Sequence, residues 1–357
     1  MWRWGHVLCA TCIKNCFRTK NKESQEPVLV DLLDLVALGT VADLVPLDFN
    51  NRILVSVGIK IIRSGTTNFG IKAIINESKK KQAHLKTSDL SFIIAPKINA
   101  AGRLSDMTIG IQCFLAENLD QASSFAKQLI KFNENRKLIE SDMVFSAIEE
   151  LNDQSFKNSH SIVLTNDKWH QGVVGILASR LKEKFFRPTI IFANFNDEMI
   201  KGSGRSIDSF HLRDILDLIS KRHHSLIKTF GGHAMAAGLS IKKNDFKKFS
   251  EIFELTCQEL ITPDLLNQTV EYDKSIEPEN LNYPMAKMIN EQVWVQGFPA
   301  PFFVDNFDVL HQEVIAERHI KCFLKKGKKF QAIIFNNNQT LPDKIRAVYS
   351  IDANEFN

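Results

Sequence analysis

The sequence predicts a mixed α/β protein that ends in a small all-β domain. Three observations support this fold class: a helical apolar pattern without Gly or Pro over residues 119–151, a strand, helix and strand pattern over 161–193, and short apolar runs after Pro263. At 357 residues and 44% apolar composition, the chain is long enough for two or three domains, each with its own core.

The first segment is expected to be the end of an α/β domain, over residues 1–115. Residues 28–41 are almost wholly apolar, and 35–41 are followed by a turn at 43–46. This pattern predicts a helix end running into a buried strand of a parallel sheet. From 51 to 110 the apolar spacing is mostly helical, and Gly65, Gly70 and Gly102 are expected to mark turns.

The next two segments are predicted to be a long helix and a second α/β domain. Apolar residues recur every three or four positions over 119–151, and a helix of that length would be ~50 Å long. Residues 116–153 are therefore expected to connect two domains, although an ordinary core helix is the alternative. Over 154–265 we predict strands at 161–165, 189–193 and 199–206, with helices at 173–184, 212–220 and 246–260.

The last segment, residues 266–357, is predicted to be an incomplete β-barrel. Its short apolar runs, at 302–304, 319–324, 332–335 and 347–351, are separated by Gly, Pro, Asn and Lys. The sequence stops at Asn357 within an expected strand. We therefore expect this barrel to be unfinished.

Charge and composition limit the class of protein. Lys and Arg total 45 against 41 Asp and Glu, so any nucleic-acid surface must be local. No apolar run reaches the ~18 to 20 residues of a membrane span, and residues 1–17 are too polar for a signal peptide. Six cysteines, three of them isolated in the sequence, are typical of reduced thiols. These features predict a soluble, cytoplasmic protein without membrane contact.

Asp43 is the candidate metal ligand, because it follows the expected strand at 35–41 and ligands gather at the carboxyl ends of such strands. The alternative is that Asp43 caps a helix or a turn. In Asn-Ala-Ala-Gly-Arg, Asn99 and Arg103 are expected on a small-residue turn, where the guanidinium can hold a phosphate in bidentate fashion.

Three further motifs predict phosphate contacts. His170 and Gln171 precede the helix at 173–184, whose free amides attract anions, while Trp169 either stacks on a base or belongs to the core. In Lys-Gly-Ser-Gly-Arg-Ser we expect a cradle of exposed amides, with donors from Ser203, Arg205 and Ser206. Its spacing is not that of a P-loop.

The third of these motifs is a tight turn at Gly231 and Gly232, which allows His233 to donate to a phosphate oxygen. The alternative is a histidine that packs a small helix at a glycine turn.

In this order, the segments Leu-Gly-Thr-Val-Ala-Asp-Leu-Val-Pro, Asn-Ala-Ala-Gly-Arg, Trp-His-Gln-Gly-Val-Val-Gly-Ile, Gly-Ser-Gly-Arg-Ser and Gly-Gly-His-Ala-Met-Ala-Ala-Gly resemble the later motifs of RecJ exonucleases, in the DHH phosphoesterase superfamily. The resemblance covers about residue 28 to the end. It implies that 1–115 is the C-terminal part of a DHH domain, followed by a connecting helix, a DHH-associated domain and an incomplete OB-fold.

The resemblance also implies an activity: hydrolysis of single-stranded DNA from its 5′ end by two metal ions, Mn²⁺ or Mg²⁺, in DNA repair and recombination. It implies that Asp43 is the last metal ligand, and that Arg103, Ser203, Arg205 and His233 hold the DNA end. A monomer that works with single-strand-binding protein and a helicase is expected.

The family's earlier motifs, including Asp-His-His, have no counterpart in this sequence. Because Asp43 alone cannot hold two metals, we expect a start inside a longer gene and an inactive polypeptide. One alternative is a non-catalytic single-stranded-DNA-binding protein. Another is a phosphodiesterase for short oligonucleotides or cyclic dinucleotides, against which the β-rich region from about residue 267 argues, since a small substrate needs no tracking barrel.

Overall fold

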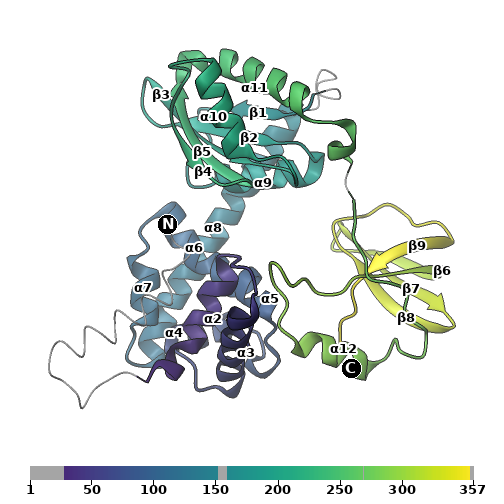
Figure 1. Cartoon of the computed structure of the whole chain (residues 1–357). Helices are drawn as coiled ribbons and strands as arrows, with labels where there is room; N and C mark the ends of the chain where they lie inside the picture. Colours follow the sequence, from purple (N-terminus) through teal and green to yellow (C-terminus); the bar gives the residue numbers. More distant parts are fainter. Residues whose placement is uncertain (1–27, 152–158, 268, 354–357) are drawn as a thin grey trace. The chain divides into compact units, whose positions relative to one another are not determined.

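The computed structural model describes residues 28–151, 159–267 and 269–353 (Figure 1). Packing groups the described residues into two compact units: 28–96, 113–126 and 270–353 form the first, while 97–112, 127–151, 159–267 and 269 form the second. The predicted division into four consecutive segments stays a prediction. The expected strand at Asn357 lies outside the described residues.

The N-terminal region is helical. Its elements are α2 (Leu33–Ala42), α3 (Phe49–Ser64), α4 (Phe69–Glu77), α5 (Thr87–Asp89), α6 (Ala95–Leu104) and α7 (Thr108–Phe114), with single turns η2 (Leu29–Leu32), η3 (Gln82–His84) and the π-turn η4 (Leu90–Ile94). The helical prediction for 51–110 is confirmed. Gly65 ends α3 with φ 91°, as a turn residue, but Gly70 and Gly102 lie inside α4 and α6.

The predicted strand at 35–41 is wrong, because these residues belong to α2. A short, almost uniformly apolar run has no periodicity that separates a buried strand from a buried helix. Tertiary contacts decide in favour of the helix: a β-carbon on Gly58 of α3 would stand 2.1 Å from the Leu33 carbonyl oxygen, so the two helices pack backbone to backbone. Asp34 is buried in α2 and accepts from the Thr67 hydroxyl at 2.6 Å and the Asn68 amide at 2.7 Å.

The second unit is a five-stranded sheet between two helical layers (Figure 1). Its elements after α8 (Leu119–Leu151) are β1 (Ile162–Thr165), α9 (Val174–Phe185), β2 (Thr189–Asn194), β3 (Met199–Arg205), α10 (Leu212–Arg222), β4 (Ile227–Gly232), β5 (Ala236–Lys242), η6 (Lys243–Asp245), α11 (Phe246–Leu260) and η7 (Pro263–Leu266). The long helix and the βαβ unit are confirmed, since β1 and β2 pair in parallel.

The strand order β1-β2-β3-β5-β4 places β3 in the centre of this sheet. One face packs on α9 and the end of α8 through Ile191, Ala193, Leu177 and Met143. The other face packs on α10 and α11 through Phe192, Leu239, Leu216 and Phe249. Apolar side chains that alternate along β2 supply both cores, as expected of a strand covered on both faces.

The C-terminal region contains α12 (Tyr283–Glu291) and four strands, β6 (Phe303–Ile315), β7 (His319–Lys326), β8 (Lys328–Ile334) and β9 (Lys344–Tyr349). They form an antiparallel sheet of order β8-β7-β6-β9 around a core that includes Phe307, Ile320, Cys322 and Leu324. The described strands do not close into a barrel, which is compatible with the predicted incomplete OB-fold. In the described part of the chain, every helix is too short or too polar to cross a membrane.

Candidate functional site

The central strand β3 presents Lys201, Ser203 and Arg205 on the face that carries α9, because alternate residues of a strand point to one side. Gly202 and Gly204 point to the other face, where a β-carbon on Gly202 would stand 2.6 Å from the Phe192 ring. Arg205 Nη1 donates to Ser203 Oγ at 3.1 Å and to the Gly204 carbonyl oxygen at 2.8 Å. Ser203 therefore orients the guanidinium.

The predicted cradle of exposed amides at Gly202 and Gly204 is wrong. Gly202 and Gly204 lie in a strand that is paired on one side with β2 and on the other with β5, so their amides belong to the sheet. The two glycines make room for the core rather than for a ligand. Side chains, and not backbone amides, are the donors that this motif offers.

Arg103 reaches the same place from the end of α6. The expected small-residue turn is a helix, and Asn99 lies exposed one turn before Arg103. Arg103 Nη1 donates to the Gly172 carbonyl oxygen at 3.0 Å, and a β-carbon on Gly172 would stand 2.2 Å from the Arg103 carbonyl oxygen. Only a glycine at 172 permits this approach of α6 to the start of α9.

The beginning of α9 completes the cluster. A β-carbon on Gly175 would stand 2.9 Å from Ser203 Oγ and 3.1 Å from Arg205 Nη2. Thus α6, α9 and β3 meet at two glycines, and their contact brings Arg103, Ser203 and Arg205 together. We call these three residues the basic cluster.

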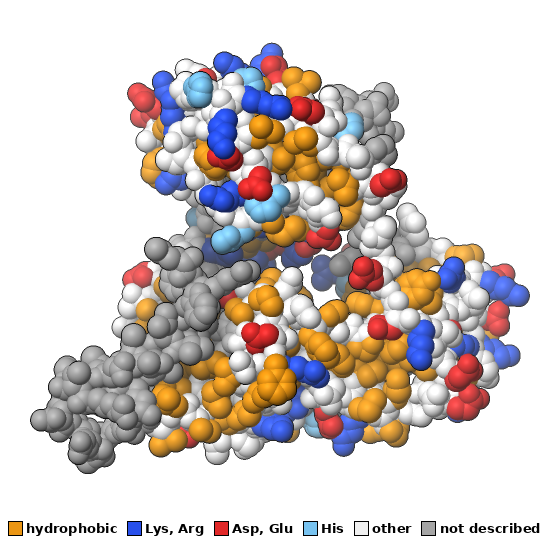
Figure 2. Space-filling view, viewed as in Figure 1, with side chains coloured by type: hydrophobic (Ala, Val, Ile, Leu, Met, Phe, Trp, Pro, Cys, Tyr) orange, Lys and Arg blue, Asp and Glu red, His pale blue; other side chains and the backbone are white. Residues whose placement is uncertain are grey.

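The basic cluster places two like charges near each other. Partial burial lowers the pKa of Arg205, and the charge of Arg103 lowers it further. Burial and the charge of Arg136 lower the pKa of Arg103, while Glu140 opposes that change. Guanidinium groups remain protonated at neutral pH, so both arginines carry a positive charge there. On the face that Figure 2 shows, basic and acidic side chains are interspersed.

The other residues predicted at the start of α9 have local partners. Trp169 is only 6% exposed and lies in the core, so the core alternative is confirmed. His170 is exposed, and its Nδ1 accepts from the Gly172 amide at 3.0 Å. Gln171 donates to the Asn194 carbonyl oxygen. The expected free amides are partly occupied, because Val173 and Val174 donate to the His170 carbonyl oxygen.

Ser206 does not face a ligand, in contrast to the prediction. It is fully buried and its hydroxyl donates to the Phe210 carbonyl oxygen, while its amide donates to Met235 at 3.0 Å. Ser206 therefore fixes the chain after β3. The sequence alone could not distinguish this structural role from phosphate binding, because Ser206 is a serine next to Arg205 in either case.

The glycine motif forms the β4–β5 hairpin, as the predicted tight turn. The His233 amide donates to the Ala236 carbonyl oxygen at 2.8 Å, and Gly232 has φ 144° with no room for a β-carbon. The imidazole of His233 is exposed. Register places Gly231 opposite Gly238, and Gly238 opposite Ser203, on one face of the sheet. Space above Gly231 and Gly238 is open, so a strip of bare backbone adjoins the basic cluster.

Asp43 is the C-cap of α2 and not the end of a strand. Its amide donates to the Gly39 carbonyl oxygen at 3.1 Å and its side chain is exposed. Among the described residues, no group of three or more His, Cys, Asp or Glu side chains is placed to hold a metal ion. The donors present in the described chain therefore do not fit a two-metal centre.

Sequence reasoning missed the roles of Gly172, Gly175 and Gly238, and it missed the ion pairs behind Arg103. Glu140 of α8 is buried and binds Arg136 of the same helix and Arg180 of α9, the latter at 2.8 Å. The sequence signal that could have indicated the close approach of α9 to β3 is Gly175, a glycine inside a helical pattern.

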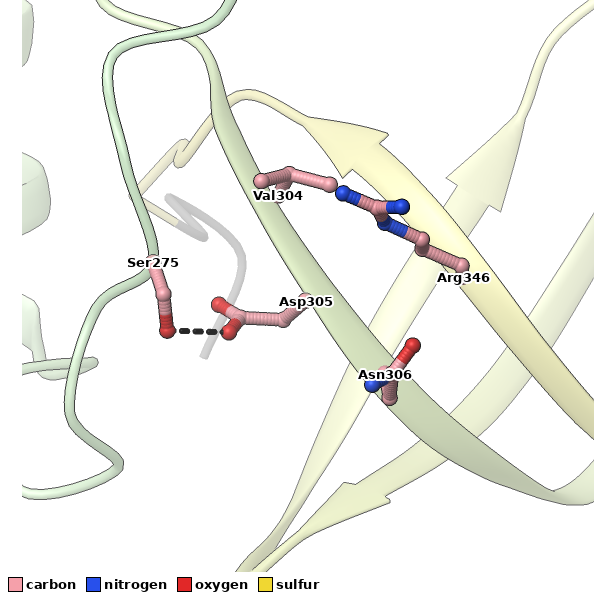
Figure 3. Close-up of a pocket in the computed structure, with 5 residues that line it drawn as sticks. All are labelled: Ser275, Val304, Asp305, Asn306 and Arg346. Atoms are coloured by element: carbon pink, nitrogen blue, oxygen red, sulfur yellow. Dashed lines mark hydrogen bonds between the residues drawn. The ribbon is translucent and has the colours of Figure 1, made fainter.

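A second polar site lies in the C-terminal sheet. Ser275, Val304, Asp305, Asn306 and Arg346 line a hollow of about 410 Å³ (Figure 3). Asp305 and Ser275 point toward each other, and the buried Asp305 carboxylate also accepts from Lys326 Nζ at 2.6 Å and the Tyr349 hydroxyl at 2.7 Å. These bonds tie the segment at 275 to β6, β7 and β9, which is a structural role.

Comparison with protein families identifies two domains. The DHHA1 domain matches residues 158–259, which contain β3, α9 and the β4–β5 hairpin. The RecJ OB domain matches residues 272–357.

Known proteins agree with both matches. The single-stranded-DNA-specific exonuclease RecJ of Escherichia coli is 41% identical over 342 residues, which are 92% of this chain and 59% of the relative. RecJ of Bacillus subtilis is 35% identical over 216 residues, 60% of this chain and 27% of that protein. The crystal structure of Thermus thermophilus RecJ with Mg²⁺ superposes with a TM-score of 0.76 at 26% identity, covering 90% of this chain and 49% of that one.

The chain spans about 59% of the length of the Escherichia coli relative. The same Thermus thermophilus protein was also solved with Mn²⁺, and its TM-score is again 0.76. The chain therefore carries a DHHA1 domain and a RecJ OB domain, and over most of its length it is similar to RecJ proteins.

Proposed function

We propose that the second unit holds the phosphate-bearing end of single-stranded DNA, as the DNA-binding part of a RecJ-type 5′ to 3′ exonuclease. The observation that carries this proposal is the basic cluster, where two guanidinium groups repel each other beside a serine hydroxyl. A phosphate supplies the missing negative charge and accepts bidentate hydrogen bonds from each arginine.

The proposal assigns roles around the cluster. Arg205 and Arg103 bind the phosphate, and Ser203 both orients Arg205 and donates through its hydroxyl. Other exposed groups lie on the same unit and complete the path of the strand: Asn99, His170, Gln171, Gly231, Gly232 and His233. The open strip at Gly231 and Gly238 admits a sugar or base without a steric clash.

The hydrolytic step of the family is a further proposal. Its RecJ relative was solved with Mg²⁺ and with Mn²⁺, and Asp43 is the residue of this chain that we assign as a metal ligand and catalytic group. Since the described residues include no group of three or more side chains placed to hold a metal ion, we propose that this polypeptide alone binds DNA without cleaving it. That behaviour is the one expected of the alternative, a non-catalytic single-stranded-DNA-binding protein.

The cellular setting follows from the family. We propose DNA repair and recombination in the cytoplasm, with a monomer that works beside single-strand-binding protein and a helicase. The third candidate, a phosphodiesterase for short oligonucleotides, is disfavoured by the RecJ OB domain at 272–357. A nuclease that tracks a long strand should bind more tightly as the strand lengthens, whereas an oligonucleotide phosphodiesterase should not.

The test uses 5′-labelled, 5′-phosphorylated single-stranded DNA with Mn²⁺. Retardation without shortening is expected, and shortened products would contradict the proposed lack of cleavage. Arg205→Ala should weaken binding for every sequence and reduce the slope of log affinity against log salt by roughly 0.7, as for one lost phosphate contact.

Arg213→Ala is the matched control, because Arg213 is an exposed arginine on α10, behind the opposite face of the sheet. It should change neither the affinity nor the slope. Equal behaviour of the two variants would sink the assignment of the basic cluster.

A further inference from the structure

A solvent-exposed aromatic ring lies at the end of the strand pair that carries the basic cluster. Phe195 follows β2 and is 50% exposed, and Lys201 of β3 holds its Nζ 3.4 Å from the centre of the ring. An ammonium group over a phenyl face is a favourable cation–π contact, which favours this orientation of both side chains. The pair is a preformed surface with an aromatic and a cationic part.

Hydrogen bonds close the turn after β2 and hold the backbone that carries the ring. The Phe195 amide donates to the Met199 carbonyl oxygen at 3.0 Å, and the Asn196 side chain accepts from the amides of Glu198 and Met199. Gln171 ties the end of β2 to the start of α9. Little conformational entropy remains to be lost when a flat ligand stacks on this ring.

The spacing along β3 matches a polynucleotide. Lys201 and Ser203 are two residues apart on the same face, which is about 6.6 Å for a strand. Successive phosphates of an extended single strand are separated by a similar distance. A phosphate bound at Ser203 and Arg205 therefore places the neighbouring phosphate within reach of Lys201.

We propose that Phe195 and Lys201 form a second nucleotide subsite, in which Lys201 binds the phosphate next to the one in the basic cluster and Phe195 stacks on a base. This inference rests on the proposed function. Stacking on an aromatic ring accepts every base, since each has a π-face. Asp197 and Glu198 are exposed in the following turn, and their charge ends the phosphate track at this point.

The test measures binding of a 5′-phosphorylated oligothymidylate by fluorescence anisotropy, with single abasic positions placed at the first, second or third nucleotide. Phe195→Ala and Phe195→Leu should each weaken binding of the intact strand about tenfold, since leucine keeps the apolar bulk but not the ring. Phe145→Ala, which removes an exposed phenyl group from α8, is the control and should have no effect.

At one of the three abasic positions, the wild-type protein should lose as much affinity as Phe195→Ala loses for the intact strand. For that abasic strand, the wild type and Phe195→Ala should bind equally. If Phe195→Ala binds more weakly than the wild type at all three abasic positions, the ring acts only on the fold, and the proposed subsite is wrong. Lys201→Ala should flatten the salt dependence, unlike Lys221→Ala, whose lysine pairs with Asp217 on α10.

The same experiment separates this inference from the proposed function. If Arg205→Ala weakens binding while Phe195→Ala does not, the subsite is wrong and the basic cluster stands. If Arg205→Ala also leaves binding unchanged, the basic cluster fails and the subsite fails with it.

Discussion

Gly175 lies directly against Arg205, since a β-carbon at 175 would stand 3.1 Å from Nη2 of that arginine. The same β-carbon would stand 2.9 Å from Ser203 Oγ. Both atoms are at the ends of side chains, which can move without disturbing the sheet. The first turn of α9 thus limits where the guanidinium can lie.

Gly175→Ala should therefore weaken single-stranded-DNA binding while leaving the fold intact. We expect a loss of roughly tenfold, the size of one displaced charge-assisted hydrogen bond. The measurement is anisotropy for binding and thermal unfolding for stability. Gly102→Ala is the control, because its β-carbon meets no atom closer than 3.8 Å. Unimpaired binding in Gly175→Ala would show that Arg205 need not occupy its present position.

Gly172→Ala should instead destabilise the second unit. Its β-carbon would stand 2.2 Å from the Arg103 carbonyl oxygen, and a backbone atom can move only if α6 moves. Overpacking of this kind costs ~1 to 3 kcal/mol in the free energy of unfolding. Chemical denaturation monitored by circular dichroism measures it, and a stability equal to that of the wild type would contradict the close approach of α6 and α9.

Glu140→Ala should destabilise the protein by removing the carboxylate that α8 and α9 share. Arg136 is almost as buried as Glu140, and it would be left without its counter-ion. Breaking a buried pair in this way costs ~3 kcal/mol or more. Glu183→Ala is the control, since Glu183 forms an exposed pair with the same Arg180 at 3.4 Å. Denaturation midpoints of the two variants should differ clearly, and equal midpoints would show that the shared carboxylate contributes little.

The C-terminal sheet should lose stability in acid through Asp305. Burial alone would raise the pKa of Asp305, but hydrogen bonds from Lys326, Ser275 and Tyr349 outweigh it and lower that pKa. A carboxyl group whose pKa is lowered by folding stabilises the native state above its unfolded pKa, about 3.9, and loses this contribution as the pH falls through the lower, folded value. The effect should therefore be confined to pH below about 4.

Fluorescence of Trp294 reports this transition, because Trp294 packs against a small core that includes Ile276 and Phe303 of β6. Asp305→Asn should remove the Asp305 part of the acid dependence and destabilise the sheet at neutral pH, because Lys326 loses its partner. An acid dependence identical to that of the wild type would assign the transition to other carboxylates.

Long periodic segments were predictable from the sequence. The helices at 119–151 and 246–260 have the predicted limits, because many apolar residues with intervals of three and four define one face. The strand pair β1 and β2 was predictable for a similar reason, since turn residues bound two short β-branched runs. The segment at 35–41 was not, because its side chains are apolar on every side and its partner, Gly58 of α3, is distant in sequence.

The candidate site was predictable in its residues but not in its geometry. Arg103, Ser203 and Arg205 do meet, although the expected turn at 99–103 is a helix and the predicted strand at 199–206 offers side chains rather than exposed amides. Glycine in a sequence signals either a turn or a close approach, and only the three-dimensional packing distinguishes them. Ser206 and Ser203 have the same chemistry, yet Ser203 lies in β3 beside Arg205, whereas Ser206 follows the strand and is buried, so their partners differ.

Gly231 and Gly238 present backbone without side chains beside the basic cluster, on the proposed path of the DNA strand. Because this backbone surface presents the same groups to adenine, guanine, cytosine and thymine, it cannot distinguish one base from another. We therefore expect binding at this point to depend on the sugar and phosphate groups and to be equally strong for strands of any base composition.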